Sequence, residues 1–280
     1  MIIILKRLKG PHYAVAYLLF IACIMYIAFS NHKRRPPRKD QKIIELGKQL
    51  FPKKAYVITL DDHHGLELSK SINESLQVNT QFIRADRGLT HTKDLHIFTR
   101  YMMDTGRVDH KLIGNYAMVG CLMSHVKIWK NLTESVFIFE EDAILDGENT
   151  RDLIASELYE ASAYNWSVLL LTERNRFGWA DDEINILSPL LGSCSSCRWY
   201  GTRGYIITPV GASILLEYYL PLLVQVDGLM ALVNAYDDRF KMLWVLYPTV
   251  LQLNNAPSTI QTTSCTKCSH LDDYLDPRRW

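Results

Sequence analysis

Short apolar runs in the middle of the chain predict the strands of a buried sheet. Residues 56–60, 136–139 and 168–171 are such runs, each followed directly by polar or acidic side chains, and residues 205–207 form a shorter run. The runs at 136–139 and 168–171 do not alternate apolar with polar side chains. Continuous apolar strands are expected where helices cover both faces of a sheet, as in parallel α/β proteins.

Helical patterns lie between these runs. Residues 211–220 predict a helix that ends at Pro221, because proline cannot continue the helical hydrogen bonding. Another helix is predicted by apolar side chains at spacings of three, four and three, which share one helix face: Val119, Leu122, Val126 and Trp129. Strands that alternate with helices predict an α/β fold with a mixed, mostly parallel sheet, in one domain at residues 55–257.

The N-terminus has a different pattern. Residues 13–29 are apolar or aromatic without interruption and have basic residues on both sides. As a helix they would span about 25 Å, slightly less than a hydrocarbon core of about 30 Å. We therefore expect a transmembrane signal-anchor at residues 13–30 after a cytosolic tail at residues 1–12. A signal peptide cleaved near Ser30 is the alternative, and the basic flanks argue against a buried core helix.

The orientation of this anchor follows from two opposing patterns. Residues 31–54 are polar and basic and predict a stem, and the positive-inside rule alone would place them in the cytosol. Three N-glycosylation sequons, at Asn73, Asn131 and Asn165, oppose that orientation. We expect a single-pass type II membrane protein whose domain lies in the lumen of the Golgi or the endoplasmic reticulum.

The cysteines include two Cys-x-x-Cys pairs. Cys194 and Cys197 form the first, and Cys265 and Cys268 the second, in a C-terminal tail at residues 258–280. In a lumenal protein, disulfides between the tail and the first pair are the preferred interpretation. A zinc protein is an alternative, although zinc-binding pairs are usually about 15 to 20 residues apart. A redox protein is another, although its pair is expected at a helix start.

Composition narrows the range of partners only slightly. The chain is 48% hydrophobic and 22% charged, with a formal net charge of +1. These values are ordinary for a globular protein and give no indication of a nucleic-acid partner.

Candidate chemistry lies at Glu140, Glu141 and Asp142, directly after the run at 136–139. Like charges about 4 Å apart repel by about 1 kcal/mol in water and by more in a desolvated site. Residues i and i+2 of an extended segment point the same way, so Glu140 and Asp142 could share a divalent metal while Glu141 points elsewhere. An exposed acidic turn neutralised by Lys or Arg is the alternative. Ligands of open α/β sheets bind at the carboxyl ends of strands, where these acids are expected.

Further motifs stand in a fixed order around the acids. Residues 120–129 are GCLMSHVKIW, residues 200–207 are YGTRGYII, a Gly-Ala pair follows at 211–212, and Asp227 comes later. This ordered set resembles glycosyltransferase family 25, which includes lipooligosaccharide and collagen galactosyltransferases, over about residues 55–252. The Ser-His helix followed by the acidic strand is the most specific part of the resemblance.

The resemblance implies a single GT-A-type domain that moves a sugar, often galactose, from a UDP-sugar to a hydroxyl of a glycan, glycoprotein or glycolipid. It also implies Mn²⁺ or Mg²⁺, which bridges the leaving diphosphate as a Lewis acid. Glu140 and Asp142 are the expected metal ligands, and Glu141 is expected close to the donor sugar or also on the metal.

An inverting transfer also needs a general base near the acceptor hydroxyl. Asp227 matches the late acid of the family, and Glu173 follows a predicted strand at the same edge of the sheet, so both are candidates and Asp227 ranks first. A helix-capping or surface acid is the alternative for each.

Nucleotide contacts are implied at further positions of the family pattern. The candidates for uridine contacts are Thr59, Leu60, Asp61 and Asp86. Ser124 and His125 are cofactor-site candidates, since His125 could contact a phosphate or fix the metal-binding strand. A structural hydrogen bond is the alternative for His125, and a charged loop that turns at Gly88 is the alternative for Asp86.

The chain departs from the family pattern at two places. The middle acid of the triplet is usually Asp and is Glu141 here, and an arginine-rich segment after the first strand is replaced by DDHHG at residues 61–65. These departures leave open a catalytically inactive, membrane-anchored relative that binds sugar nucleotides.

Overall fold

The computed structural model describes residues 40–105, 112–145, 147, 149–171, 185–194, 201–246 and 251–253. The predicted anchor at residues 13–30 and the C-terminal tail at residues 258–280 lie outside this part of the chain. Among the helices that are described, none is long and apolar enough to cross a membrane. The membrane anchor therefore stays a prediction.

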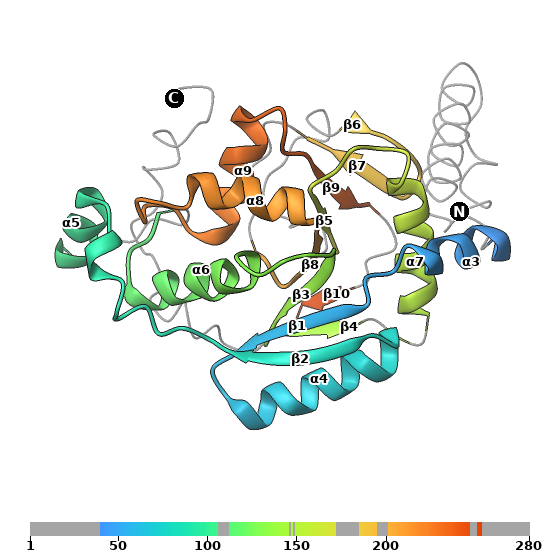
Figure 1. Cartoon of the computed structure of the whole chain (residues 1–280), viewed down its shortest axis with the longest axis horizontal. Coiled ribbons are helices and arrows are strands. Elements are labelled where there is room, and N and C mark those ends of the chain that lie inside the picture. Colours follow the sequence, from blue (N-terminus) through green and yellow to red (C-terminus); the bar gives the residue numbers. More distant parts are fainter. Residues whose placement is uncertain are drawn as a thin grey trace, which may run out of the picture. The chain divides into compact units, whose positions relative to one another are not determined.

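The domain is built on an eight-stranded sheet with the strand order β2-β1-β3-β8-β5-β9-β7-β6 (Figure 1). Its strands are β1 (Lys54–Thr59), β2 (Asn79–Arg84), β3 (Val136–Glu140), β5 (Val168–Leu170), β6 (Asn185–Ile186), β7 (Leu191–Ser193), β8 (Gly204–Ile207) and β9 (Met242–Val245). The four runs that predict strands correspond to β1, β3, β5 and β8. A separate antiparallel pair joins β4 (Ala143–Leu145) to β10 (Leu251–Leu253).

The α/β class and the mixed sheet are confirmed, but the prediction of a mostly parallel sheet is wrong. In the described part of the sheet, β1 pairs in parallel with β2 and β3, and β5 with β9. The other four pairings are antiparallel, because β7 and β8 run against their neighbours. An apolar run indicates burial on both faces of a sheet, and burial does not depend on strand direction. All four residues of β8 are buried, like the apolar residues of β3.

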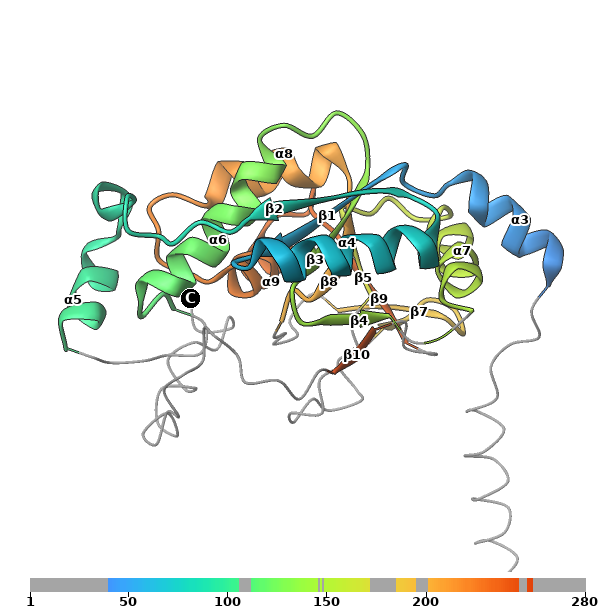
Figure 2. The same ribbon diagram turned by 90° about the horizontal axis from the view of Figure 1, so that it is seen from below.

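Helices cover both faces of the sheet (Figure 2). One face packs against α6 (Tyr116–Trp129), α8 (Pro209–Tyr218) and α9 (Val226–Tyr236), and the other against α4 (Asp62–Leu76) and α7 (Thr150–Ala161). The helices predicted around Val119 and at residues 211–220 correspond to α6 and α8.

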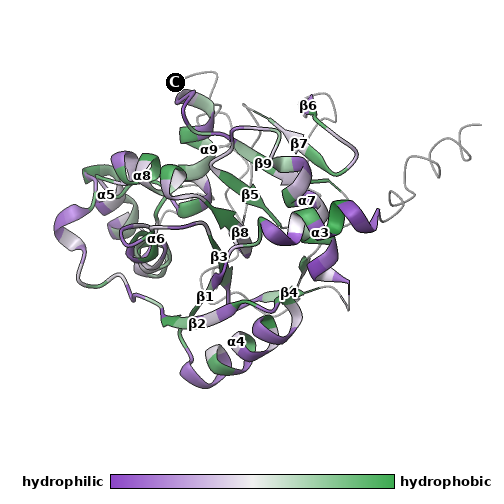
Figure 3. Ribbon diagram, turned by 45° about the vertical axis from the view of Figure 1, so that its right-hand side comes forward, coloured by the Kyte–Doolittle hydropathy of each residue, from purple (hydrophilic) through white to green (hydrophobic). Residues whose placement is uncertain are grey.

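Successive side chains of each central strand enter the two hydrophobic cores in turn. Ile138 belongs to the core under α6, and its neighbours Phe137 and Phe139 belong to the core under α7. Burying one such side chain stabilises the fold by about 1.5–3 kcal/mol. The hydrophobic strands between the two helical layers, such as β5, are green in Figure 3.

Smaller elements complete the described chain. Helix α3 (Gln41–Gln49), in the range predicted as a stem, packs against α7 and buries Ile44. The 3-10 helix η1 (Thr92–Asp94) and helix α5 (Ile97–Thr105) follow the loop after β2.

The loop after β2 lies against α6. Gly88 adopts a φ of +74°, in the left-handed region that favours glycine. A Cβ atom on Gly120 would overlap with the carbonyl oxygen of Asp86. The two glycines allow the loop and the helix to approach closely, and this contact places Asp86 beside Ser124.

Candidate functional site

Three segments meet at one edge of the sheet. The parallel strands β1 and β3 both end there, at Thr59 and Glu140, and β8 begins there because it runs antiparallel to β3. The Glu140 N–H donates to the carbonyl oxygen of Arg203 at 2.9 Å. Thr202 and Arg203 therefore lie beside the end of β3, at the edge where α/β sheets bind their ligands.

The two outer acids of the triplet face the segment that leads into β8. Glu140 accepts a hydrogen bond from the Thr202 hydroxyl, and Asp142 accepts a hydrogen bond from Arg203 Nε at 2.9 Å. The Oδ1 atom of Asp142 is buried and has no hydrogen-bond partner among the described residues. The structure thus brings Glu140 and Asp142 to the same segment, whereas their role as metal ligands stays a prediction.

The middle acid points toward β1 instead. Glu141 Oε2 accepts hydrogen bonds from Thr59 Oγ1 at 2.9 Å and from the Leu60 N–H at 3.1 Å. The carbonyl oxygen of Glu141 accepts from His64 Nε2 at 2.9 Å. Glu141 is thus separated from the two outer acids as predicted, but the chain turns at residues 141 and 142 and is not extended there, and Glu141 joins the ends of two neighbouring strands.

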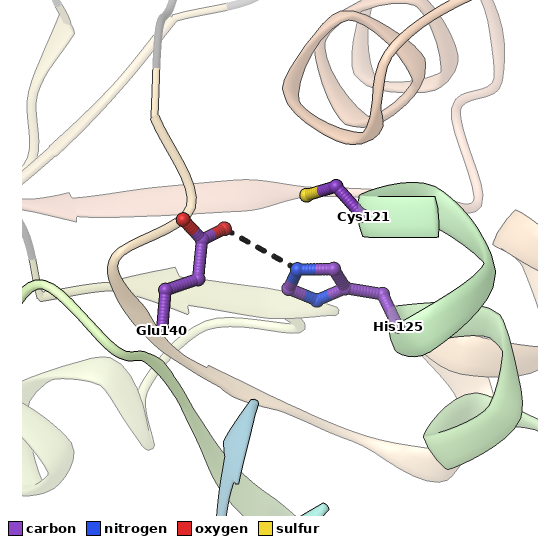
Figure 4. Close-up of side chains that lie close together, drawn as sticks. All are labelled: Cys121, His125 and Glu140. Carbon is purple, nitrogen blue, oxygen red and sulfur yellow. Dashed lines mark hydrogen bonds and ion pairs between the residues drawn. The ribbon is translucent and has the colours of Figure 1, made fainter. Parts of the chain in front are cut away.

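His125 connects the end of β3 to the core. Its Nε2 lies 3.3 Å from Glu140 Oε1, and its Nδ1 lies 2.7 Å from the hydroxyl of Tyr205, which also accepts from Trp129 Nε1 at 3.1 Å. We assign the tautomer from these contacts: the Tyr205 hydroxyl donates to Nδ1, and Nε2–H donates to Glu140. His125 is fully buried, so this chain of hydrogen bonds orients the Glu140 carboxylate. Figure 4 shows its last bond, between His125 and Glu140.

Asp227 lies in the first turn of α9, close to the same acids. It is 8% exposed, its Oδ2 accepts from the Gly201 N–H at 3.0 Å, and its Oδ1 accepts from the Gly228 N–H at 2.7 Å. Burial is the main cause that raises the pKa of Asp227, to about 6; the N–H donors of Gly201 and Gly228 act against this rise and the charge of Glu140 adds to it. Glu173, the other candidate base, lies outside the described residues.

The carboxylates of the site have perturbed pKa values. Burial alone would raise the pKa of Glu140, but hydrogen bonds from His125 and Thr202 and the charge of Arg203 lower it overall. Burial, and then the charge of Glu140, raises the pKa of Asp142 despite its bond to Arg203. A buried group of acids with these opposed shifts is typical of a functional site.

The candidates at the end of β1 make contacts within the protein. The side chain of Asp61 caps α4, where Oδ1 accepts from the His64 and His63 N–H groups, and these bonds lower the pKa of Asp61. The Thr59 side chain is buried, whereas Leu60 is 41% exposed. Their contacts with a nucleotide stay predictions.

Ser124 and Asp86 contact each other. The buried Ser124 hydroxyl donates to the Gly120 carbonyl at 2.6 Å and accepts from the Asp86 N–H at 2.8 Å. Asp86 Oδ1 accepts from the Gly88 N–H at 2.6 Å, and Oδ2 lies 3.0 Å from His91 Nε2. Ser124 therefore fixes the charged loop that turns at Gly88, and a cofactor contact stays a prediction for both residues.

Sequence reasoning did not assign roles to several residues of this site. Thr202, Arg203 and Tyr205 all lie in the motif YGTRGYII, which was the available signal. Their contacts depend on β8 lying antiparallel beside β3, which the motif does not indicate.

Of the four cysteines in the two Cys-x-x-Cys pairs, the structure describes Cys194. Cys197, Cys265 and Cys268 lie outside the described residues. The disulfide, zinc and redox hypotheses for these pairs stay predictions.

Comparison with protein families agrees with the order of the motifs. The model of glycosyltransferase family 25, described as an LPS biosynthesis protein, matches residues 52–230. This range is more than half of the chain and includes α6, the acidic triplet, the start of β8 and Asp227. A comparison with curated proteins gave no significant match. The chain belongs to glycosyltransferase family 25.

Proposed function

We propose that the chain is a metal-dependent, inverting glycosyltransferase with a GT-A-type domain. It would move a hexose, with galactose as the first candidate, from a UDP-sugar to a hydroxyl of a glycan, glycoprotein or glycolipid. Family membership supports sugar transfer from a nucleotide-sugar donor. The proposal of a metal rests on Glu140 and Asp142, which face the same segment at the sheet edge and include a buried carboxylate oxygen, Asp142 Oδ1, without a partner among the described residues.

The donor set fits a hard divalent cation such as Mn²⁺ or Mg²⁺. Carboxylate oxygens are the ligands that these cations prefer. An unpaired buried acceptor costs about 1–3 kcal/mol, and a cation beside Asp142 Oδ1 would offset that cost. Glu140 and Asp142 would hold the ion, which when bound supplies a Lewis acid for the leaving diphosphate.

Asp227 is the proposed general base. A group whose pKa is about 6 is mostly deprotonated at neutral pH and still basic enough to accept a proton from an acceptor hydroxyl. The N–H groups of Gly201 and Gly228 hold the Asp227 carboxylate in one orientation. Glu173 remains the second candidate.

The end of β1 is the proposed position of the donor nucleotide. Thr59, Leu60 and Asp61 lie there, beside Glu141, and the exposed Leu60 side chain supports a contact at this edge. Asp86 is proposed as a further uridine contact, with Ser124 behind it.

We also propose a type II membrane protein of the Golgi or the endoplasmic reticulum. The support is the apolar segment at residues 13–30 and the sequons, whose asparagines Asn73, Asn131 and Asn165 are all exposed. A mobility shift of the expressed chain after treatment with peptide-N-glycosidase tests this topology. The type II topology would be contradicted if the chain carries no N-glycans and a membrane-impermeant reagent labels its domain only from the cytosolic side.

The experiment that tests the activity uses the purified full-length chain and a panel of UDP-sugars, with Mn²⁺, Mg²⁺ or EDTA. We expect turnover with one donor that needs the metal, and a loss of about 100-fold or more in Asp142→Asn, as for other groups that stabilise a transition state. Asp238→Asn, at an exposed aspartate, is the matched control and should keep wild-type activity.

Two results would contradict the proposal in different ways. Equal activity of Asp142→Asn and the wild type would remove Asp142 from the metal site. If no UDP-sugar is turned over and UDP does not bind in a metal-dependent way, both hypotheses are excluded: the enzyme and the inactive relative that binds sugar nucleotides.

A further inference from the structure

Helix α6 brings a thiol and an imidazole to the end of β3. Cys121 and His125 are one helical turn apart, and both side chains reach toward Glu140 (Figure 4). One potential ligand atom from each of these three residues lies within 4.8 Å of the other two. Cys121 is a free cysteine, and the residue as a whole is partly buried.

We propose that Cys121, His125 and Glu140 form a binding site for Zn²⁺. This site is distinct in its ligands from the carboxylate pair Glu140 and Asp142, because it adds a sulfur and a nitrogen, but the two sites share Glu140.

The ligand chemistry selects the kind of metal. Thiolate and imidazole ligands with one carboxylate suit Zn²⁺ and its analogue Co²⁺, whereas Mn²⁺ and Mg²⁺ prefer oxygen ligands. Residues i and i+4 lie on one side of a helix, so Cys121 and His125 can bind one ion without a change of backbone. Three protein ligands leave one position of a tetrahedral zinc site open.

The surroundings of His125 also suit a metal ligand. Histidines that bind metals usually donate their other ring N–H to an oxygen, which fixes the ring. The hydroxyl oxygen of Tyr205, 2.7 Å from Nδ1, is placed to accept that hydrogen bond. Zinc binding at Nε2 would then leave the ring proton of His125 on Nδ1 and replace the hydrogen bond from Nε2 to Glu140.

The local charge favours a divalent cation. Burial, and to a smaller extent the charges of Glu140, Asp227 and Asp142, raise the pKa of the Cys121 thiol, and a ligand oxygen of Glu140 lies within 4.8 Å of the sulfur. Arg203, bound to Asp142, is the cation that opposes these carboxylates. A divalent ion beside the sulfur would balance the remaining negative charge, and its binding would release the thiol proton.

A consequence follows that rests on the proposed function. If Glu140 also binds the cation of the donor, Zn²⁺ held by Cys121 and His125 takes this carboxylate away from it. Zn²⁺ should therefore inhibit the Mn²⁺-dependent transfer, and the inhibition should need Cys121.

The binding test uses Co²⁺ as the probe and does not depend on activity. The purified full-length chain and Cys121→Ser are titrated with Co²⁺, and the thiolate-to-cobalt charge-transfer absorption is recorded, followed by displacement with Zn²⁺. Because all other cysteines are the same in both proteins, the difference spectrum reports Cys121 alone. We expect the wild type to show additional charge-transfer absorption that Zn²⁺ removes, and identical spectra would overturn the proposed site.

A second measurement needs no variant. Alkylation of Cys121 by iodoacetamide is followed by peptide mass spectrometry in the wild type, with and without Zn²⁺. We expect saturating Zn²⁺ to slow this alkylation by about tenfold or more, because only the fraction of the protein without bound Zn²⁺ has a free thiol to react. An unchanged rate would overturn the site even where Cys121→Ser fails to fold.

The inhibition is tested on the same two proteins. We expect Cys121→Ser to keep its Mn²⁺-dependent turnover and to need about tenfold or more Zn²⁺ for half-inhibition. If Zn²⁺ inhibits both proteins equally, the hypothesis that the two metal sites share Glu140 is wrong, whereas the zinc site itself is not contradicted. A chain that binds Co²⁺ through Cys121 but turns over no donor would contradict the proposed function and support the zinc site.

Discussion

Replacing Tyr205 by phenylalanine removes one oxygen atom from the core and tests the hydrogen bonds that end at Glu140. The Tyr205 hydroxyl accepts from Trp129 Nε1 at 3.1 Å and lies 2.7 Å from His125 Nδ1. Tyr205, Trp129 and His125 are all buried. In Tyr205→Phe, His125 Nδ1 and Trp129 Nε1 therefore both lose their hydrogen bond to the Tyr205 hydroxyl. Because the site is buried, water does not readily replace that hydroxyl.

The expected loss of stability follows from these two contacts. A buried polar group without a partner costs about 1–3 kcal/mol. Two groups lose their partner here, and the cost of burying the tyrosine hydroxyl is no longer incurred. Together these effects predict that the free energy of unfolding falls by about 2–4 kcal/mol. This is a large fraction of the roughly 5–15 kcal/mol by which a domain is stable. The phenylalanine ring fills the same space, so no cavity adds to the effect.

The same substitution should lower the activity. With Nδ1 of His125 unpaired, the ring no longer holds Glu140 in one orientation. Loss of an outer partner of a metal ligand typically lowers metal affinity or activity by about 10- to 100-fold. We expect a loss of this size in the rate of metal-dependent transfer, which the inactive-relative hypothesis does not predict.

Urea unfolding of the purified chain measures the stability, with Tyr159→Phe on the exposed side of α7 as the matched control. Tyr159→Phe should unfold like the wild type. If Tyr205→Phe also unfolds within about 0.5 kcal/mol of the wild type, the usual range of neutral surface changes, the hydroxyl does not stabilise the core and the reasoning is refuted.

Further predictions concern three other residues. The pKa of Asp227 is about 6 and a base must be deprotonated, so kcat/KM should rise with pH to a plateau with a midpoint near this value. A pH profile of Asp227→Asn should lack this rise, and its persistence would exclude Asp227 as the base. Gly120→Ala should destabilise the chain by about 1–3 kcal/mol in thermal unfolding, because the new Cβ overlaps with the Asp86 carbonyl; an unchanged Tm would show that the loop can shift. Burial raises the pKa of Glu157 well above its usual range, and its oxygens have no hydrogen-bond partner among the described residues. The folded state therefore holds this proton more tightly than the unfolded state, and stability falls by up to about 1.4 kcal/mol for each pH unit above the unfolded pKa of about 4.3. Glu157→Gln should remove that fall and gain more stability over the wild type at pH 7 than at pH 4, whereas an equal difference at both pH values would contradict it.

The central strands and α6 could be predicted because burial on both faces leaves a direct mark on the sequence. Neither β2 nor the direction of β8 leaves such a mark. Strand β2 is at the edge of the sheet and alternates partly buried with exposed residues, and its sequence NTQFIR is largely polar. The direction of β8 depends on the strands with which it pairs. A short apolar run predicts a buried strand, but it does not predict whether that strand is parallel or antiparallel to its neighbours.

The candidate site shows the same division between local and long-range information. The sequence predicts that Glu140 and Glu141 contact different segments, and they do, although the chain turns at residues 141 and 142 and is not extended there. The hydrogen-bond partners of His125 in α6 are Glu140 at the end of β3 and Tyr205 in β8, and Tyr205 is far from His125 in the sequence. A tyrosine inside an apolar run does not show that its hydroxyl meets a histidine, so this part of the site could be found only in three dimensions.

The two departures from the family pattern meet in the structure. Glu141, where the family usually has Asp, reaches Thr59 and Leu60 at the end of β1, and its carbonyl oxygen accepts from His64 of the DDHHG segment. An aspartate at this position would be shorter by one methylene. The glutamate and the histidine thus belong to one local rearrangement that ties β1 to β3. Glu141 makes these contacts with β1, whereas Glu140 and Asp142 contact Thr202 and Arg203. The departures therefore leave the contacts of the two outer acids in place and do not by themselves indicate an inactive protein.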